Sequence, residues 1–113
     1  MKHFSISNYK ISNKSKPFII AEISSNHKGS LSSILKLIKE IKLAGADAVK
    51  IQTYNEDIMT LASKKKNFKI NKGIWKKYSL YKLYKEAKTP FSWHKYIFDY
   101  AKKIGIICFS TPF

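Results

Sequence analysis

The sequence predicts an α/β fold of about three β/α units, preceded by a small β-hairpin. Apolar runs of strand length recur along the chain, segments with a helical apolar period separate them, and a glycine follows each long helical segment. Strands joined by helices in this way pair in parallel through right-handed crossovers. Three such units do not close a core, so we expect the N-terminal portion of a TIM (β/α)₈ barrel, truncated after its third strand.

The first segment, residues 1–16, is expected to form the hairpin. It contains two short alternating runs, 3–7 and 9–12, which meet near Asn8. Residues 13–17 have the composition of a turn. The remaining residues, 17–113, are assigned to the incomplete barrel domain.

The first barrel strand is predicted at residues 18–23, an apolar run that only Glu22 interrupts. Runs of this kind are typical of strands covered on both faces, as in parallel sheets. Ser30 is a suitable N-cap for the following helix, and Gly45 is expected to end it. The apolar face of that helix comprises Leu31, Ile34, Leu35, Ile38 and Ile41.

The second strand is predicted at residues 47–51, followed by the polar residue Gln52. A long lysine-rich loop, 53–78, comes next, and loops of that length after a strand are usually functional or mobile. A short helix is expected over residues 80–87. The aromatic side chains of this region, Trp75 among them, are expected to pack rather than to bind a sugar.

The third unit begins at Thr89 and Pro90, a predicted N-cap followed by a proline in the first helical position. Its helix is expected to end at Gly105. The third strand, 106–109, leads into the polar segment 110–113. Because Cys108 lies in this apolar strand, we expect a buried and unreactive thiol.

Composition narrows the class of protein. The formal net charge is +15, but all 22 basic residues are lysine, whereas phosphate and base recognition favours arginine. We therefore expect most lysine side chains to lie on the surface in contact with water. A basic module that binds nucleic acid is kept as the alternative. No apolar run is long enough to cross a membrane, no signal peptide is evident at the first residues, and the single cysteine suits a reducing cytoplasm.

Polar residues occur where the predicted strands end, which is where barrel enzymes place their active sites. Side chains alternate along a strand, so Lys50 and Gln52 share a face. A carboxylate within an apolar strand is costly unless it is paired or functional, and Glu22 is such a group. We expect Glu22 and Lys50 to face one cavity at one rim, pair there, and leave an anion site nearby.

Three separated blocks of the sequence resemble the sialic acid synthase family, over roughly residues 17–113. They are Ile20-Ala21-Glu22-Ile23 with Asn26-His27 and Gly29-Ser30; Ala44-Gly45-Ala46-Asp47-Ala48-Val49-Lys50 with Gln52-Thr53; and Phe109-Ser110-Thr111-Pro112-Phe113. The stretch Leu80–Ala87 with Thr89–His94 is most similar to the pseudaminic acid synthase branch. The resemblance implies an aldolase-type barrel that condenses phosphoenolpyruvate with an N-acetylated aldose.

The resemblance also assigns roles by position. Glu22 matches a glutamate that handles a proton, on the sugar oxygen or the attacking water, and Lys50 matches a lysine that binds the phosphate or carboxylate of phosphoenolpyruvate. Gln52 matches a neighbouring polar ligand. The remaining positions border the sugar pocket in the family and are expected to bind substrate: Asn26, His27, Ser110, Thr111 and Phe113.

The implied reaction forms a carbon–carbon bond. C3 of phosphoenolpyruvate attacks the sugar aldehyde, water adds at C2, and phosphate leaves by C–O cleavage, while a divalent ion, Mn²⁺ or Mg²⁺, polarises the aldehyde. The metal ligands are expected beyond Phe113, as is a C-terminal domain that completes the partner's site in a domain-swapped homodimer. The fragment alone is therefore expected to be inactive.

Two alternatives for the substrate and the type of barrel enzyme stay open. The sugar substrate could be that of an N-acetylneuraminate or legionaminate synthase, rather than the N-acetylated 6-deoxy-hexose of pseudaminic acid biosynthesis. Another barrel enzyme that uses phosphoenolpyruvate with a sugar phosphate is disfavoured only by the resemblance of residues 80–94.

Overall fold

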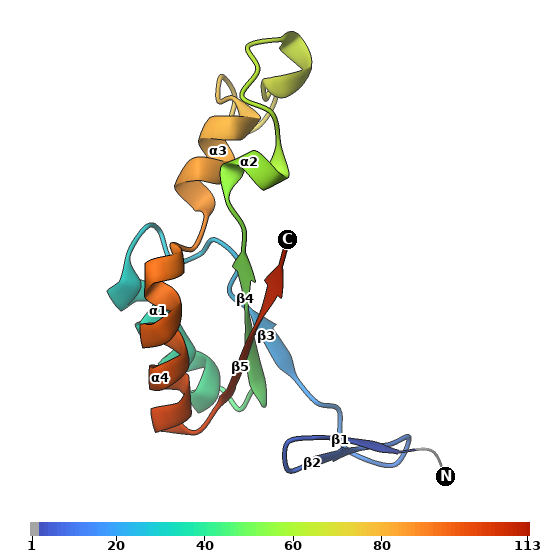
Figure 1. The fold of residues 1–113 in the computed structure, drawn as a ribbon. Helices are drawn as coiled ribbons and strands as arrows, with labels where there is room; N and C mark the ends of the chain where they lie inside the picture. The colour runs from blue at the N-terminus through green and yellow to red at the C-terminus, as the bar shows by residue number, and fades with distance from the viewer. Residues whose placement is uncertain (1–2) are drawn as a thin grey trace.

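The computed structural model describes residues 3–113. One three-stranded sheet carries two helices on a single face, the hairpin lies beyond one end of the sheet, and a smaller helical lobe lies beyond the other (Figure 1). The strands are β1 (Phe4–Ile6), β2 (Tyr9–Ile11), β3 (Ile20–Glu22), β4 (Ala48–Thr53) and β5 (Ile107–Pro112). The helices are α1 (Leu31–Leu43), α2 (Glu56–Met59), α3 (Leu80–Ala87) and α4 (His94–Ile104), with 3₁₀ turns η1 (Lys66–Phe68) and η2 (Phe91–Trp93).

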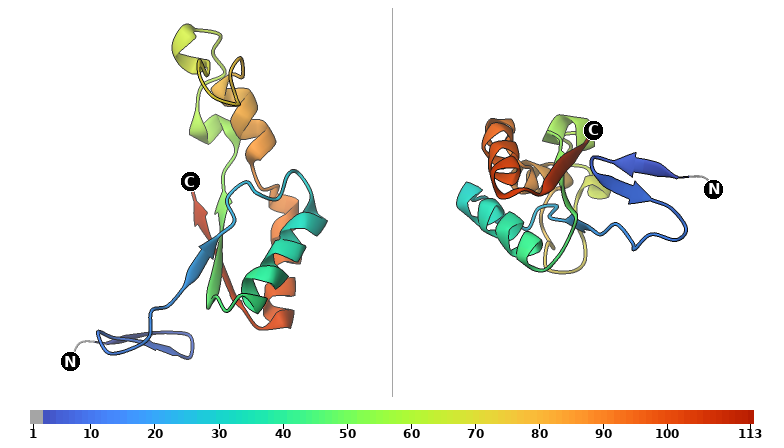
Figure 2. Two further views of the ribbon diagram at one scale, coloured as in Figure 1. Left: turned by 180° about the vertical axis from the view of Figure 1, so that it is seen from behind. Right: turned by 90° about the horizontal axis from the view of Figure 1, so that it is seen from below.

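The main sheet is parallel throughout, in the order β3-β4-β5, and confirms the predicted α/β class. Its register places Glu22 beside Lys50 and Gln52 beside Thr111. All three strands therefore end at the same edge, next to the lobe formed by α2, α3 and the loop between them (Figures 1 and 2).

One face of the sheet holds the core. Val49 and Ile51 of β4 are fully buried against Ile34 and Ile38 of α1 and Ile97 of α4. Burial of each such side chain contributes roughly 1.5–3 kcal/mol, so this layer supplies much of the folding free energy of the unit. The layer exists because odd-numbered residues of β4 and the apolar stripes of both helices meet on one side.

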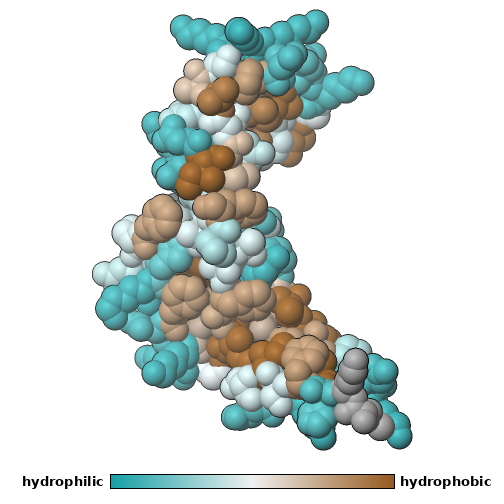
Figure 3. All heavy atoms as spheres, turned by 45° about the vertical axis from the view of Figure 1, so that its right-hand side comes forward, coloured by the Kyte–Doolittle hydropathy of each residue, from teal (hydrophilic) through white to brown (hydrophobic). Residues whose placement is uncertain are grey.

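The other face of the sheet is open. It carries the pair Glu22 and Lys50, together with exposed apolar side chains such as Ile20 and Phe109. Apolar side chains gather over the sheet and the hairpin in the space-filling view (Figure 3). The radius of gyration is 17.2 Å, against about 13 Å for a compact domain of similar length, so the fold is extended rather than closed.

Most helix boundaries follow the sequence signals. The Ser30 hydroxyl accepts a hydrogen bond from the Ser33 amide at 3.3 Å, which confirms it as the N-cap of α1. Gly45 and Gly105 follow α1 and α4 with φ of +92° and +74°, the left-handed conformation that favours glycine. Lys42 then links both helix ends by donating to the Gly105 carbonyl at 2.8 Å.

The start of the third unit differs from the prediction. Thr89 caps no helix: its hydroxyl is buried and makes no hydrogen bond within residues 3–113. Pro90 instead precedes the 3₁₀ turn η2, and α4 begins only at His94. Pro90 has an extended backbone with a ψ of 135°, so it is not the first helical residue and Thr89 has no helix to cap.

The hairpin prediction is confirmed for the described residues. β1 and β2 pair antiparallel, with Phe4 opposite Ile11, and the turn between them includes Ser7 at a φ of 52°. Residues 1 and 2 of the predicted segment lie outside the described residues. The ring of Tyr9 packs edge-on against Phe18 at 5.1 Å, which joins the hairpin to the segment leading into β3.

Candidate active site

The site is built around an ion pair at the ends of two neighbouring strands. Glu22 is the last residue of β3, and Lys50 lies beside it on β4. The Lys50 ammonium lies 2.8 Å from one carboxylate oxygen of Glu22, and the other oxygen accepts the Ser24 amide at 3.0 Å. The prediction that these two side chains share a face and a rim is therefore confirmed.

The pair is accessible rather than buried. About a third of each side chain is exposed, 33% for Lys50 and 34% for Glu22. Ion pairs in such a setting contribute about 0–1 kcal/mol, so this one adds little to the stability of the fold. A bound anion can therefore replace Glu22 as the partner of Lys50 with little loss of free energy. The Ser24 amide would still hold the carboxylate in its orientation.

Further predicted residues lie on the same face. Gln52 follows Lys50 by two positions on β4, and Thr111 lies beside Gln52 on β5. The Phe113 amide donates to the Thr53 carbonyl at 3.1 Å, and its ring packs edge-on against Tyr54. The strand ends thus bring a carboxylate, an ammonium, an amide and a hydroxyl to one surface.

The loop after β3 shapes one side of this surface. It turns sharply: Ser24 and Lys28 both adopt positive φ, 50° and 52°, which is uncommon for residues with a side chain. The Asn26 side-chain amide donates to the Ile23 carbonyl at 2.9 Å and so holds the turn. Local strain of this kind persists only where the surroundings enforce it, and it is frequent at functional sites.

His27 lies behind the site rather than in it. Its ring is 1% exposed, packs edge-on against Trp93 at 5.4 Å, and accepts the Gly29 amide through Nδ1 at 3.0 Å. The neutral ring therefore carries its proton on Nε2. This atom is buried, and none of residues 3–113 accepts a hydrogen bond from it within the usual distance and angle. Burial lowers the pKa of His27, and the backbone of Ala87 opposes that shift more weakly.

Ser110 points to the helix side of the sheet. Its hydroxyl donates to the Ile51 carbonyl and contacts the Thr53 hydroxyl, which in turn lies 2.6 Å from His94 Nε2. His94 Nδ1 lies 3.2 Å from the Pro90 carbonyl, so this network ties β4, β5 and the start of α4 together. The direct substrate contacts expected of His27 and Ser110 stay predictions, and their packing favours a positioning role.

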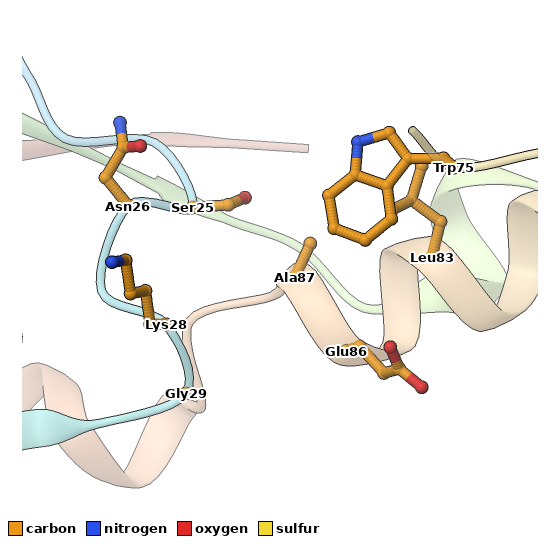
Figure 4. Close-up of a pocket in the computed structure, with 8 residues that line it drawn as sticks. All are labelled: Ser25, Asn26, Lys28, Gly29, Trp75, Leu83, Glu86 and Ala87. Carbon is orange, nitrogen blue, oxygen red and sulfur yellow. The ribbon is translucent and has the colours of Figure 1, made fainter. Parts of the chain in front are cut away.

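Two adjoining hollows extend from the strand ends into the lobe. The smaller, about 270 Å³, begins at Ser24 and Gln52 and reaches Trp75 and Leu83. The larger, about 530 Å³, lies between the loop after β3 and α3. Both share a wall made of Ser25, Trp75, Leu83 and Ala87, and Figure 4 shows the Trp75 indole facing Ser25 and Ala87 across the larger hollow.

The sequence-based assignment did not anticipate how the lobe is held against the sheet. Glu56 is 7% exposed and pairs with Lys88 at 2.7 Å, which fixes α2 to the end of α3. The hydrogen bond from Lys88 lowers the pKa of Glu56. The pair joins positions far apart in the chain, and its sequence signal, an acidic residue directly after Asn55, is weak. Cys108 is half-buried rather than fully buried as expected, and burial raises the pKa of its thiol to about 11, which disfavours the reactive thiolate.

The described residues do not supply a complete metal site. Within 3–113, no three His, Cys, Asp or Glu side chains converge on one point. In the same part of the chain, no helix has both the length and the apolar character to span a membrane.

The chain folds as a parallel α/β unit with a carboxylate and an ammonium at the carboxyl ends of its strands, the edge where proteins of this fold class bind their ligands. Comparison with known proteins gives the family. Residues 37–113 match the model of the NeuB family. The chain belongs to the NeuB family.

Individual relatives agree with this assignment. The chain is 58% identical over 98 residues to a pseudaminic acid synthase of Campylobacter jejuni, which is 87% of this chain and 29% of that protein. It is 44% identical over 97 residues to the pseudaminic acid synthase of Helicobacter pylori, 86% of this chain and 28% of that protein. The chain thus spans less than a third of the length of these relatives.

A solved structure gives the corresponding likeness in three dimensions. The N-acetylneuraminic acid synthetase of Leptospira borgpetersenii, crystallised with citrate, superposes with a TM-score of 0.77 at 28% identity. The match covers 99% of this chain and 34% of that one. The parallel sheet and its helices are therefore a family fold.

Proposed function

We propose that the complete protein is a phosphoenolpyruvate-dependent nonulosonic acid synthase, and that this chain carries part of its active site. The observation that carries the proposal is the contact between Glu22 and Lys50 at 2.8 Å on the open face of the sheet. A cation beside an oriented carboxylate suits a reaction that binds a phosphorylated anion and moves a proton in the same place.

Each group has a distinct task in this proposal. Lys50 binds the phosphate or carboxylate of phosphoenolpyruvate and leaves its contact with Glu22 when that anion arrives. Glu22, held by the Ser24 amide, then handles the proton of the sugar oxygen or of the attacking water. Gln52 and Thr111, side by side on β4 and β5, offer hydrogen bonds to the sugar. Asn26 holds the loop that borders it.

The proposed reaction forms one C–C bond and breaks the C2–O bond of phosphoenolpyruvate. C3 of phosphoenolpyruvate forms a bond to the aldehyde carbon of the open-chain sugar, whose oxygen takes up a proton. Water adds to C2, and phosphate leaves with the bridging oxygen as the C2–O bond breaks. The products are the sugar acid and inorganic phosphate.

The sugar is proposed to be an N-acetylated 6-deoxy-hexose, as in pseudaminic acid biosynthesis. Two relatives named pseudaminic acid synthase are 58% and 44% identical to the chain, whereas the sialic acid synthetase of known structure is 28% identical. An N-acetylneuraminate or legionaminate synthase is the alternative within the family.

The open sheet face fits the interior wall of an aldolase-type (β/α)₈ barrel. Its exposed apolar residues, with Ile20 46% and Phe109 37% exposed, would be covered by further strands of such a barrel. We propose that the complete protein closes this barrel. A divalent ion, held by residues outside this chain, a cytoplasmic location and a domain-swapped homodimer are parts of the same proposal.

The test is phosphate release by the complete protein. Phosphoenolpyruvate is supplied with a panel of N-acetylated hexoses, including a 2,4-diacetamido-6-deoxy-hexose, with Mn²⁺, with Mg²⁺ and with chelator. We expect release that depends on the sugar and is fastest with the 6-deoxy substrate. Release with N-acetylmannosamine and with no diacetamido sugar would select the N-acetylneuraminate alternative, and release with no sugar of the panel would contradict the proposal.

A further inference from the structure

The smaller hollow begins at residues next to the proposed catalytic pair. Its near end is lined by Gln52 and by Ser24, whose amide holds Glu22. Its far end is lined by Trp75 and Leu83 of the lobe. The hollow is thus wide enough and close enough to accommodate a remote substituent of a sugar whose aldehyde carbon lies at Glu22 and Lys50.

The lining changes character along that path. Near the strand ends it is polar, with the Gln52 amide and the serine hydroxyls. Toward the lobe it is apolar, with the indole of Trp75 and the side chains of Leu83 and Ala87. An acylamino group matches this order, because its amide needs hydrogen-bond partners and its methyl group needs an apolar contact.

Charged groups stay at the edge of the apolar part. Figure 4 shows Lys28 extending along the loop toward Asn26, and the Glu86 carboxylate pointing away from the Trp75 indole. The indole is 45% exposed in spite of its size, so one of its surfaces faces open space. An uncharged substituent with apolar surface is the ligand group that this arrangement favours.

We propose that the smaller hollow, lined by Gln52, Trp75, Leu83 and Ala87, receives an acylamino substituent of the sugar remote from its aldehyde carbon. Leu83 and Ala87 then determine which acylated sugars the enzyme accepts. The inference rests on the proposed synthase function and deepens it, because it names the part of the substrate that this chain recognises. The residues come from α3 and the loop before it, outside the strand ends where the chemistry takes place.

The experiment uses the complete protein and two sugars that differ only in an acetamido group remote from the aldehyde. Leu83→Ala widens the hollow, and Ala87→Val narrows it. Leu61→Ala is the matched control, because Leu61 is 69% exposed in the same lobe and lines neither hollow. The readouts are kcat and KM for each sugar and for phosphoenolpyruvate, with a thermal melt of each variant.

A hydrophobic pocket distinguishes one or two carbon atoms by about 10- to 200-fold. We expect Leu83→Ala to raise KM for the diacylated sugar about tenfold, and to change KM for the monoacylated sugar and for phosphoenolpyruvate less than twofold. Ala87→Val is also expected to raise KM for the diacylated sugar and to leave KM for the monoacylated sugar nearly unchanged. Leu61→Ala should leave all values unchanged.

The possible failures are distinguishable. Equal changes for both sugars in Leu83→Ala and Ala87→Val, with wild-type activity intact, would overturn the inference and leave the synthase function standing. Absence of phosphate release by the wild-type protein with every sugar would overturn the proposed function, and the inference with it.

Discussion

The two faces of the main sheet differ in what they do. On the helix side, Val49 and Ile51 are fully buried beneath α1 and α4. On the open side, Lys50 lies between them in sequence, a third exposed and paired with Glu22. Both faces come from the same strand, so a single run of residues supplies stability on one side and chemistry on the other.

The difference follows from the geometry of a strand. Successive side chains point to opposite faces, so apolar residues at alternate positions build the core without fixing what lies between them. Polar residues on the other face contribute little to folding, because an ion pair that water reaches is weakly stabilising. Substitutions on the two faces should therefore separate activity from stability, and the predictions below test that separation.

The largest effect is expected for Glu22→Gln. The change keeps the size of the side chain and removes its capacity to exchange a proton, and general acid–base catalysis contributes about 10²- to 10⁴-fold. In the complete protein, kcat should fall by about that factor with an unchanged melting temperature. Glu40→Gln, on an exposed position of α1, is the control. Wild-type kcat in Glu22→Gln would contradict the assignment.

Ile38→Ala tests the helix face. Ile38 is fully buried in the core, and removing such a side chain costs about 2–5 kcal/mol of stability. Ile74, 90% exposed, is the matched control, and Ile74→Ala should stay within about 0.5 kcal/mol of the wild type. Denaturant unfolding of the complete protein measures both. A similar loss for both variants would show that the core is not where the structure places it.

Lys50→Met tests the anion site. A hydrogen bond to a charged group contributes about 1.5–3 kcal/mol, so kcat/KM for phosphoenolpyruvate should fall roughly 10- to 100-fold. The melting temperature should change little, since the pair with Glu22 is half-exposed. Lys36→Met on α1 provides a control for loss of one positive charge. If KM rose for the sugar and stayed unchanged for phosphoenolpyruvate, Lys50 would be assigned to sugar binding instead of anion binding.

The smallest effect is expected for the pH dependence of stability at His27. Burial lowers its pKa below the ordinary value of 6.5, so in the window beneath 6.5 the unfolded chain binds more protons than the folded one. Stability is therefore fully present above that value and declines as the pH falls through the window. Urea midpoints at pH 8 and pH 5.5 should differ less in His27→Gln than in the wild type. An equal difference in both proteins would rule out this contribution.

Much of the fold could be predicted because its signals are local. The helix predicted at 80–87 has the observed bounds of α3, and Ser30 caps α1 as its position indicated. The third strand was predicted too short, at 106–109, because Ser110 and Thr111 lack the apolar character of a strand interior. They extend β5 because β4 pairs with them, which is a long-range cause.

The candidate site was predicted unevenly for the same reason. Lys50 and Gln52 lie on one face as strand alternation requires, and the register of the sheet places Glu22 and Thr111 beside them. Ser110 does not share that face, because its hydroxyl satisfies the Ile51 carbonyl and the network with Thr53 on the helix side. The hollow beside Trp75 depends on how the lobe folds back over the loop after β3, and no local pattern records that.

The sequence by itself determined that Lys50 and Gln52 project from one face of their strand, opposite Val49 and Ile51, because side chains alternate along an extended backbone. Only the tertiary structure decided that Glu22 lies on that same face and meets Lys50 at 2.8 Å, beside a hollow walled by Trp75 and Leu83. That outcome depends on strand register and on the packing of the lobe, which contacts between distant segments set.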